Sequence, residues 1–203
     1  EISFYKRVEG TIQRRKVSDP SAEIKRFEKA KDTAIDQLGE LYEKALQEVG
    51  EANAMIFQIH QMMLEDEDYV EAITNMITTQ EINAEYAVGT TGDNFSQMFA
   101  SMDDEYMRGR AADVKDVSER VVSVLTGAQS GGLTADKPVI LAADDLAPSE
   151  TVQLQKDLVL SFVTQGGSTT SHTAILARTM NIPAIIGVGK ELSQEMEGCL
   201  AIV

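Results

Sequence analysis

The chain has 203 residues, 43% of them hydrophobic, which allows a buried core of one large or two small domains and excludes a disordered protein. Its 33 acidic and 18 basic residues give a formal net charge of −15, which opposes binding to nucleic acid or anionic membranes and favours basic partners. The single cysteine excludes an internal disulfide and is typical of a reducing compartment, so we expect a cytoplasmic protein.

The first 127 residues predict mainly helices. A short strand-like run opens the chain at residues 2–7, and Ser18-Asp19-Pro20 is a helix-start signal with proline in the first turn. Apolar residues then recur every three or four positions, with Gly50 as a stop signal and the acidic run 65–68 as an interruption. The predicted helices cover about 18–49, 51–64, 69–79, 83–102 and 104–125. We expect them to form an antiparallel bundle.

The rest of the chain alternates strands and helices, which predicts a compact α/β layer. Helices are expected to begin at Pro148-Ser149-Glu150 and at His172. The predicted strands cover 138–142, 159–163, 183–188 and 200–203, and the last of them would bury Cys199. Because the opening strand has no partner near it in the sequence, we expect it to join this sheet. The α/β domain then comprises residues 1–16 and 128–203, and the helical domain is an insertion over 17–127.

His172 follows the small, polar run Gly166-Gly167-Ser168-Thr169-Thr170-Ser171 and begins an apolar helical pattern. Backbone N–H groups in the first turn of a helix have no partner inside the helix and attract anions, phosphate above all. A neutral imidazole in that place can accept a phosphoryl group. Its oxygens would be held by the close backbone of Gly167 and by the hydroxyls of Thr169, Thr170, Ser171 and Thr173. A histidine beside threonines can also be a simple capping residue, and the residues alone leave both interpretations open.

The run 166–178, followed by Ile182-Pro183-Ala184-Ile185-Ile186-Gly187, resembles the phosphohistidine signature of the PEP-utilising enzymes. That family includes enzyme I of the bacterial sugar phosphotransferase system, pyruvate phosphate dikinase and PEP synthase. Residues 59–66, 102–116 and 146–151 resemble enzyme I, whose inserted bundle the dikinases lack. The resemblance covers nearly the whole chain. It implies an α/β phosphohistidine (swivelling) domain with an inserted all-α helical bundle.

The resemblance implies an enzyme, a PEP-protein phosphotransferase whose active histidine is His172. Such an enzyme takes phosphate from PEP and passes it to a histidine of the phosphocarrier protein HPr, which docks on the bundle. The family's barrel domain, which binds PEP and Mg²⁺ and makes the full-length protein a homodimer, is not among these residues. Because the chain begins without methionine and stops inside an apparent strand, we expect a fragment. It would need no cofactor of its own and would exchange phosphate with HPr only.

The resemblance also implies which residues support the phosphohistidine. Thr151 stands where the family has a threonine that hydrogen-bonds the active histidine, and Arg178 lies two turns along the helix, far for a phosphate ligand. The full supporting set is Thr151, Gly167, Thr170, Ser171 and Arg178. Two isolated histidines and no cysteine cluster do not make a metal site, and none is expected.

The expected HPr-binding surface combines acids, which speed encounter with a basic partner, and adaptable methionines. It comprises Glu51, Met55, His60, Met62, Met63, Asp66, Asp68, Tyr69 and Arg110. The alternative is a purely structural role, in which the methionines and the tyrosine at helical spacing pack in the core of the bundle and His60 is a structural histidine.

The sequence departs from the family at the active loop, where Gly-Gly-Arg-Thr-Ser-His is usual. With the histidines aligned without gaps, Ser168 replaces the second glycine and Thr169 replaces the arginine. The loop therefore lacks a cation that could balance phosphate, and a basic residue of the barrel would have to help. Two alternative functions stay open: a dikinase-type swivelling domain, and a regulatory paralogue of a nitrogen-linked pathway that binds a partner without transferring phosphate.

Overall fold

The computed structural model describes residues 1–5, 12–128, 137–155, 157–167 and 171–202. Contacts within the chain divide it into two compact units. The sheet unit comprises Glu1–Glu9, Glu43–Ile56 and Gly131–Val203, and the helical unit comprises Gly10–Tyr42 and Phe57–Ser130. The sequence predicts that residues 43–56 belong to the helical domain. In the structure these residues, which join the first two helices, belong to the sheet unit by their contacts.

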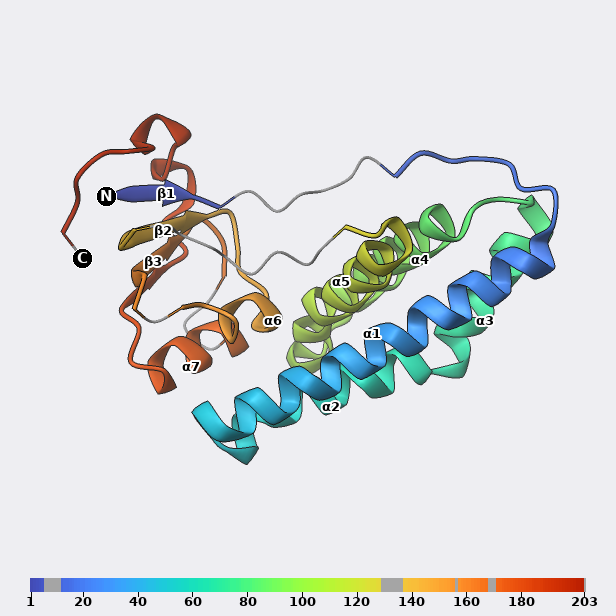
Figure 1. The fold of residues 1–203 in the computed structure, drawn as a ribbon, viewed down its shortest axis with the longest axis horizontal. Coiled ribbons are helices and arrows are strands. Elements are labelled where there is room, and N and C mark those ends of the chain that lie inside the picture. Colours follow the sequence, from blue (N-terminus) through green and yellow to red (C-terminus); the bar gives the residue numbers. More distant parts are fainter. Residues whose placement is uncertain (6–11, 129–136, 156, 168–170, 203) are drawn as a thin grey trace. The chain divides into compact units, whose positions relative to one another are not determined.

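The helices of the bundle begin and end close to the predicted residues (Figure 1). They are α1 (Pro20–Val49), α2 (Glu51–Glu65), α3 (Glu67–Gln80), α4 (Ala84–Ala100) and α5 (Glu105–Thr126). Gly50 separates α1 from α2 with φ +82°, a left-handed conformation that glycine adopts without a steric penalty. Asp66 and Asp104 cap α3 and α5, because their carboxylates accept hydrogen bonds from the first-turn amides of Tyr69 and Met107.

Apolar side chains fill the helical unit, and a charged network joins three of its helices. Arg26 of α1 pairs with Glu85 of α4, and its guanidinium also donates to the Leu125 carbonyl oxygen of α5 at 2.8 Å. Glu23 accepts a hydrogen bond from the Ala84 amide at 2.7 Å and so caps α4. Burial by itself would raise the pKa of Glu85, but hydrogen bonds from Arg26, from its own backbone and from Asn83 outweigh burial and lower the pKa to about 2.

The sheet unit contains a parallel sheet in the order β1-β2-β3-β4. Its strands are β1 (Ile2–Phe4), β2 (Val139–Ala143), β3 (Val159–Thr164) and β4 (Ala184–Ile186), and its helices are α6 (Pro148–Thr151) and α7 (His172–Thr179). Two 3-10 turns follow, η1 (Gly189–Glu191) and η2 (Gln194–Met196). Ile2 pairs with Ile140. The opening strand therefore joins the later sheet, as predicted, and the helical segment is an insertion between neighbouring strands.

The predicted strand at residues 200–203 is wrong for the part that the structure describes. Leu200 and Ile202 are 90% and 103% exposed, and Cys199 is exposed instead of buried. Ile2 does exchange backbone hydrogen bonds with Gly198 and Cys199, at 2.9 and 2.8 Å. Apolar composition favours a strand, but a strand also needs a neighbouring strand to pair with. The described part of the run therefore forms no strand beyond these two hydrogen bonds.

None of the helices in the described part of the chain is both long enough and apolar enough to cross a lipid bilayer.

Candidate active site

The loop that leads to His172 lies where the parallel strands end. Because β2, β3 and β4 run in one direction, their carboxyl ends meet at one edge of the sheet, where α/β proteins commonly bind ligands. The Gly166 amide donates to the Asp144 carbonyl oxygen after β2 at 2.8 Å, and the Gly187 amide after β4 donates to the Gly166 carbonyl oxygen at 3.1 Å. The start of the loop is therefore fixed between the two neighbouring strand ends.

Gly167 has to be a glycine in this arrangement. Its φ is +90°, a region that side-chain-bearing residues rarely adopt. A Cβ atom there would also lie 2.7 Å from Cγ2 of Ile186 on β4. The backbone of Gly167 therefore packs closely against β4, while its approach to phosphoryl oxygens stays a prediction.

His172 is the first residue of α7 and its side chain is exposed. Ser171 is the cap of the helix, since its Oγ accepts a hydrogen bond from the Ala174 amide at 3.2 Å. The first N–H groups of an α-helix have no carbonyl acceptor within the helix, because no earlier turn exists. The N–H groups of His172 and Thr173 are in this position, so helix geometry points them away from the helix along its axis. Capping therefore belongs to Ser171, and His172 is presented at the positive end of the helix dipole.

Thr151 is fully buried at the end of α6, which packs against α7. Its hydroxyl donates to the Ala147 carbonyl oxygen at 3.0 Å. The hydrogen bond between Thr151 and His172 that the resemblance implies stays a prediction. With the hydroxyl hydrogen committed to Ala147, Thr151 would have to accept that bond or rotate.

Thr173 has a role that the sequence did not reveal. It was expected to offer a hydroxyl to the phosphoryl oxygens, but it is buried, and its Oγ1 donates to the Leu146 carbonyl oxygen at 2.5 Å. Arg178 is exposed in the last turn of α7, six residues and about 9 Å of helix rise from His172. Thr170 lies outside the described residues, together with Ser168 and Thr169.

The described part of this sheet edge also carries negative charge. Asp144 and Asp145 follow β2 directly and are exposed. One carboxylate oxygen of Asp145 accepts from the Leu146 amide at 2.9 Å, and it is 3.5 Å from the position that a Cβ of Gly167 would occupy. A phosphoryl group on His172 would therefore add charge beside existing carboxylates, which favours an approaching partner that is basic.

The residues expected to bind HPr separate into exposed and buried groups. The exposed ones are Glu51, Met55, Met62, Asp66 and Asp68. Met62 is 69% exposed, the behaviour of a contact residue and not of bundle core, while Met63 is half-buried. The Arg110 side chain is 11% exposed.

His60 and Tyr69 require correction, because both are buried and cannot touch a docked partner. Tyr69 is 3% exposed, and its hydroxyl pairs with that of Ser118 at 2.7 Å. Burial raises the pKa of Tyr69 to about 12, although the Ser118 hydrogen bond acts in the opposite direction. His60 is 0% exposed and faces Asp113 and Asp116. The apolar spacing on α2 and α3 allowed either placement, and only packing against α5 distinguishes them.

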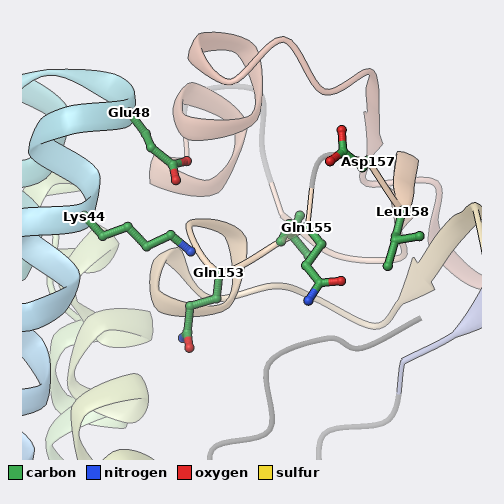
Figure 2. Close-up of a pocket in the computed structure, with 7 residues that line it drawn as sticks. Lys44, Glu48, Gln153, Gln155, Asp157 and Leu158 are labelled. Atoms are coloured by element: carbon green, nitrogen blue, oxygen red, sulfur yellow. The ribbon is translucent and has the colours of Figure 1, made fainter. Parts of the chain in front are cut away.

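A separate pocket lies elsewhere in the sheet unit, between the end of α1 and the segment after α6 (Figure 2). Its lining residues are Lys44, Glu48, Gln153, Leu154, Gln155, Asp157 and Leu158. It does not include His172, and both carboxylates and amides line it. The exposed start of α7, where His172 lies, is therefore a different place from this pocket.

Two family descriptions match the chain in succession. Residues 3–110 match the N-terminal domain of PEP-utilising enzymes, and residues 135–203 match their mobile domain. The chain belongs to the family of PEP-utilising enzymes. This confirms the resemblance that was based on the residues around His172 and on the helical block.

Individual relatives point to one branch of the PEP-utilising enzymes. The phosphoenolpyruvate-protein phosphotransferases of Bacillus subtilis and Listeria monocytogenes are 38% and 40% identical to the chain over 194 residues, which are 95% of this chain and 34% of each relative. That of Mycoplasma capricolum is 41% identical over 178 residues, 87% of this chain and 31% of the relative. The chain therefore spans about a third of the length of the curated relatives it matches.

Solved structures agree with this assignment. A solution structure of enzyme I matches with a TM-score of 0.72 and 36% identity, over 95% of this chain and 79% of that one. The N-terminal domain of a nitrogen enzyme I matches with a TM-score of 0.67 over 92% and 77%, and at 23% identity it shows the fold alone. In sequence and fold, the chain thus resembles this solved part of enzyme I.

Proposed function

We propose that this chain carries the phosphoryl group of a sugar phosphotransferase pathway on His172 and exchanges it with the phosphocarrier HPr. The observation that carries the proposal is the position of His172, exposed as the first residue of α7 at the carboxyl edge of a parallel sheet. Outward amides and the helix dipole provide a place for phosphoryl oxygens. A buried ring at this position would have contradicted a role in transfer.

The reaction would be a reversible in-line transfer between two imidazoles. As a ring nitrogen of His172 attacks the phosphorus atom of phosphorylated HPr, a new P–N bond forms and the P–N bond to the carrier histidine breaks. The reverse step uses the same atoms. The chain's contribution is to hold the loop by Gly166 and Gly167 and to anchor the first turn of α7, so that oxygens and nucleophile are aligned before the partner arrives.

In the full-length protein we propose that the phosphoryl group comes from PEP. We expect a barrel that binds PEP and Mg²⁺, and that makes the protein a homodimer, in the two thirds of the relatives' length that this chain does not match. Within the described residues, no group of three or more His, Cys, Asp or Glu side chains could hold a metal ion.

The docking surface that we propose for HPr is the exposed part of α2 and the start of α3. Met62 offers a flexible apolar contact, and Asp66 and Asp68 offer carboxylates to a basic partner. A net charge of −15 would further raise the rate at which a basic carrier meets the chain.

The test is to mix the chain with HPr that carries a ³²P-labelled phosphohistidine. We expect an acid-labile, alkali-stable label on the wild-type chain and none on His172→Ala. His60→Phe is a matched control, because it removes the other histidine of the chain and should still accept label at saturating carrier. Label that persists on His172→Ala would reject the assignment. Binding of HPr without any transfer would favour the regulatory alternative.

A further inference from the structure

A buried polar cluster joins α2 to α5 in the helical unit. The Nε2 atom of His60 lies 3.3 Å from Oδ1 of Asp113, and its Nδ1 atom lies 3.6 Å from Oδ2 of Asp116. His60 is fully buried and Asp113 is 4% exposed. An apolar side chain would fill this space with a smaller desolvation cost. Stability of the bundle therefore does not by itself account for the cluster.

The contacts of the cluster continue outward along α5. The second carboxylate oxygen of Asp113 lies 3.3 Å from Nη1 of Arg110, one turn earlier in the helix. Nη2 of Arg110 donates to the Tyr106 hydroxyl, and the guanidinium carbon lies 4.6 Å from the centre of the Tyr106 ring. Tyr106 itself is 67% exposed. A continuous set of contacts thus connects a fully buried imidazole to an exposed aromatic ring.

We propose that His60 and Asp113 are positioning residues that hold Arg110, and through it the Tyr106 ring, as a preformed contact for the phosphocarrier. This inference rests on the proposed function. Tyrosine and arginine are the residue types most often responsible for binding energy at protein interfaces. A ring that is already stacked and hydrogen-bonded loses less conformational entropy when a partner arrives. His60 and Asp113 act through Arg110 and do not themselves touch the carrier.

The first experiment examines the free chain and needs no partner. The Nε–Hε signal of Arg110 in a ¹H–¹⁵N spectrum reports whether its guanidinium is held in place. His60→Phe keeps a ring in the cluster but removes both nitrogens, and Asp113→Asn keeps the shape but removes the charge. We expect either change to move and broaden the Arg110 signal. Ser118→Ala, which removes a buried hydroxyl of the same helix that pairs with Tyr69, should leave it unchanged.

The second experiment is a double-mutant cycle on HPr binding, measured by calorimetry. We expect His60→Phe to weaken binding about two- to tenfold in the wild-type background, the loss of one preordered side chain. In a Tyr106→Ala, Arg110→Ala background the same change should have no further effect, because the groups it positions are gone. Ser118→Ala should not alter the affinity. If His60→Phe does not fold, Asp113→Asn takes its place in the cycle.

Three results would overturn the inference. The first is an Arg110 signal that neither His60→Phe nor Asp113→Asn changes. The others are additive effects on affinity in the cycle, and a carrier affinity that Tyr106→Ala leaves unchanged. A general loss of bundle stability would appear as an additive effect and would be matched by Ser118→Ala. Failure of the wild-type chain to bind HPr would instead overturn the proposed function. It would also overturn the proposal that the Tyr106 ring is a contact for the carrier. The Arg110 signal would then still decide whether His60 holds the guanidinium.

Discussion

The hydroxyl of Thr173 donates a hydrogen bond to the Leu146 carbonyl oxygen, and both residues are buried. Thr173 directly follows His172, so this contact connects the first turn of α7 to the segment between β2 and α6. The position of the His172 side chain therefore depends on a neighbouring residue that faces the interior of the sheet unit. Such anchoring matters in catalysis because a nucleophile reacts fastest when its position and orientation are fixed before the substrate binds.

Thr173→Val should remove this anchor while preserving the shape of the side chain. We expect the free energy of unfolding of the sheet unit to fall by about 1–3 kcal/mol, because a buried carbonyl loses its donor. Transfer from phosphorylated HPr should slow several-fold. Urea unfolding and rapid-quench kinetics would measure the two effects. Thr173→Ser restores the hydroxyl and should recover both, so equal losses in the two variants would contradict the role assigned to this bond.

Gly167→Ala should destabilise the active loop for two independent reasons. Its φ of +90° is strained for alanine, and the new methyl group would lie 2.7 Å from Ile186. Strain and overpacking together should cost about 2–4 kcal/mol, which thermal unfolding would detect.

Gly109→Ala is the matched control for that substitution. Gly109 lies in α5 and nothing stands within 4 Å of its would-be Cβ, so this change should stabilise the chain by about 0.5–1 kcal/mol. A Gly167→Ala variant as stable as the wild type would show that the loop conformation is not required.

Glu85 should make the stability of the helical unit depend on acid pH. Its pKa of about 2 in the folded chain lies below its ordinary value of 4.5, so its carboxylate stabilises the fold above pH 4.5. That contribution is lost as the pH falls from about 4.5 towards 2. We expect the wild type to lose on the order of 2 kcal/mol more than Glu85→Gln over this range.

Urea unfolding at pH 6, 4 and 3 would measure this difference. Glu28→Gln, at an exposed position on α1, is the control and should follow the wild-type pH dependence. Parallel pH profiles for the wild type and Glu85→Gln would show that the Arg26 pair does not stabilise the bundle.

Met62→Ala should weaken HPr binding without changing the melting temperature. Met62 is 69% exposed, so truncation removes surface that a partner could cover but little that the fold buries. We expect a loss of about 1 kcal/mol in binding free energy, roughly fivefold in Kd, by calorimetry. Met98→Ala removes another exposed methionine, 45% exposed on α4, and should leave Kd unchanged. Equal effects of the two substitutions would argue against a docking surface on α2.

Local patterns predicted most of the secondary structure because their causes are local. Helix boundaries at Gly50, Asp66 and Asp104 follow from a left-handed stop and from carboxylates that cap the next turn. The position of His172 at the start of α7 follows from the cap at Ser171 in the same way. The pairing of β1 with β2 could also be predicted, because the opening strand had no nearer partner.

Long-range packing explains what the sequence could not show. Exposed and buried methionines, histidines and tyrosines have the same helical spacing, so the sequence determined that α2 is amphipathic but not that His60 and Tyr69 face α5. The hydroxyl of Thr173 looked like a phosphate ligand until its carbonyl partner, 27 residues earlier, was known. The apolar run at 199–203 looked like a strand because composition does not reveal whether a neighbouring chain is present. The sequence by itself determined the helices, their caps and the place of His172 at the start of a helix, since these depend on residues a few positions apart. Only the tertiary structure decided which side chains face a partner and which support them, since that depends on atoms that folding brings together from distant parts of the chain.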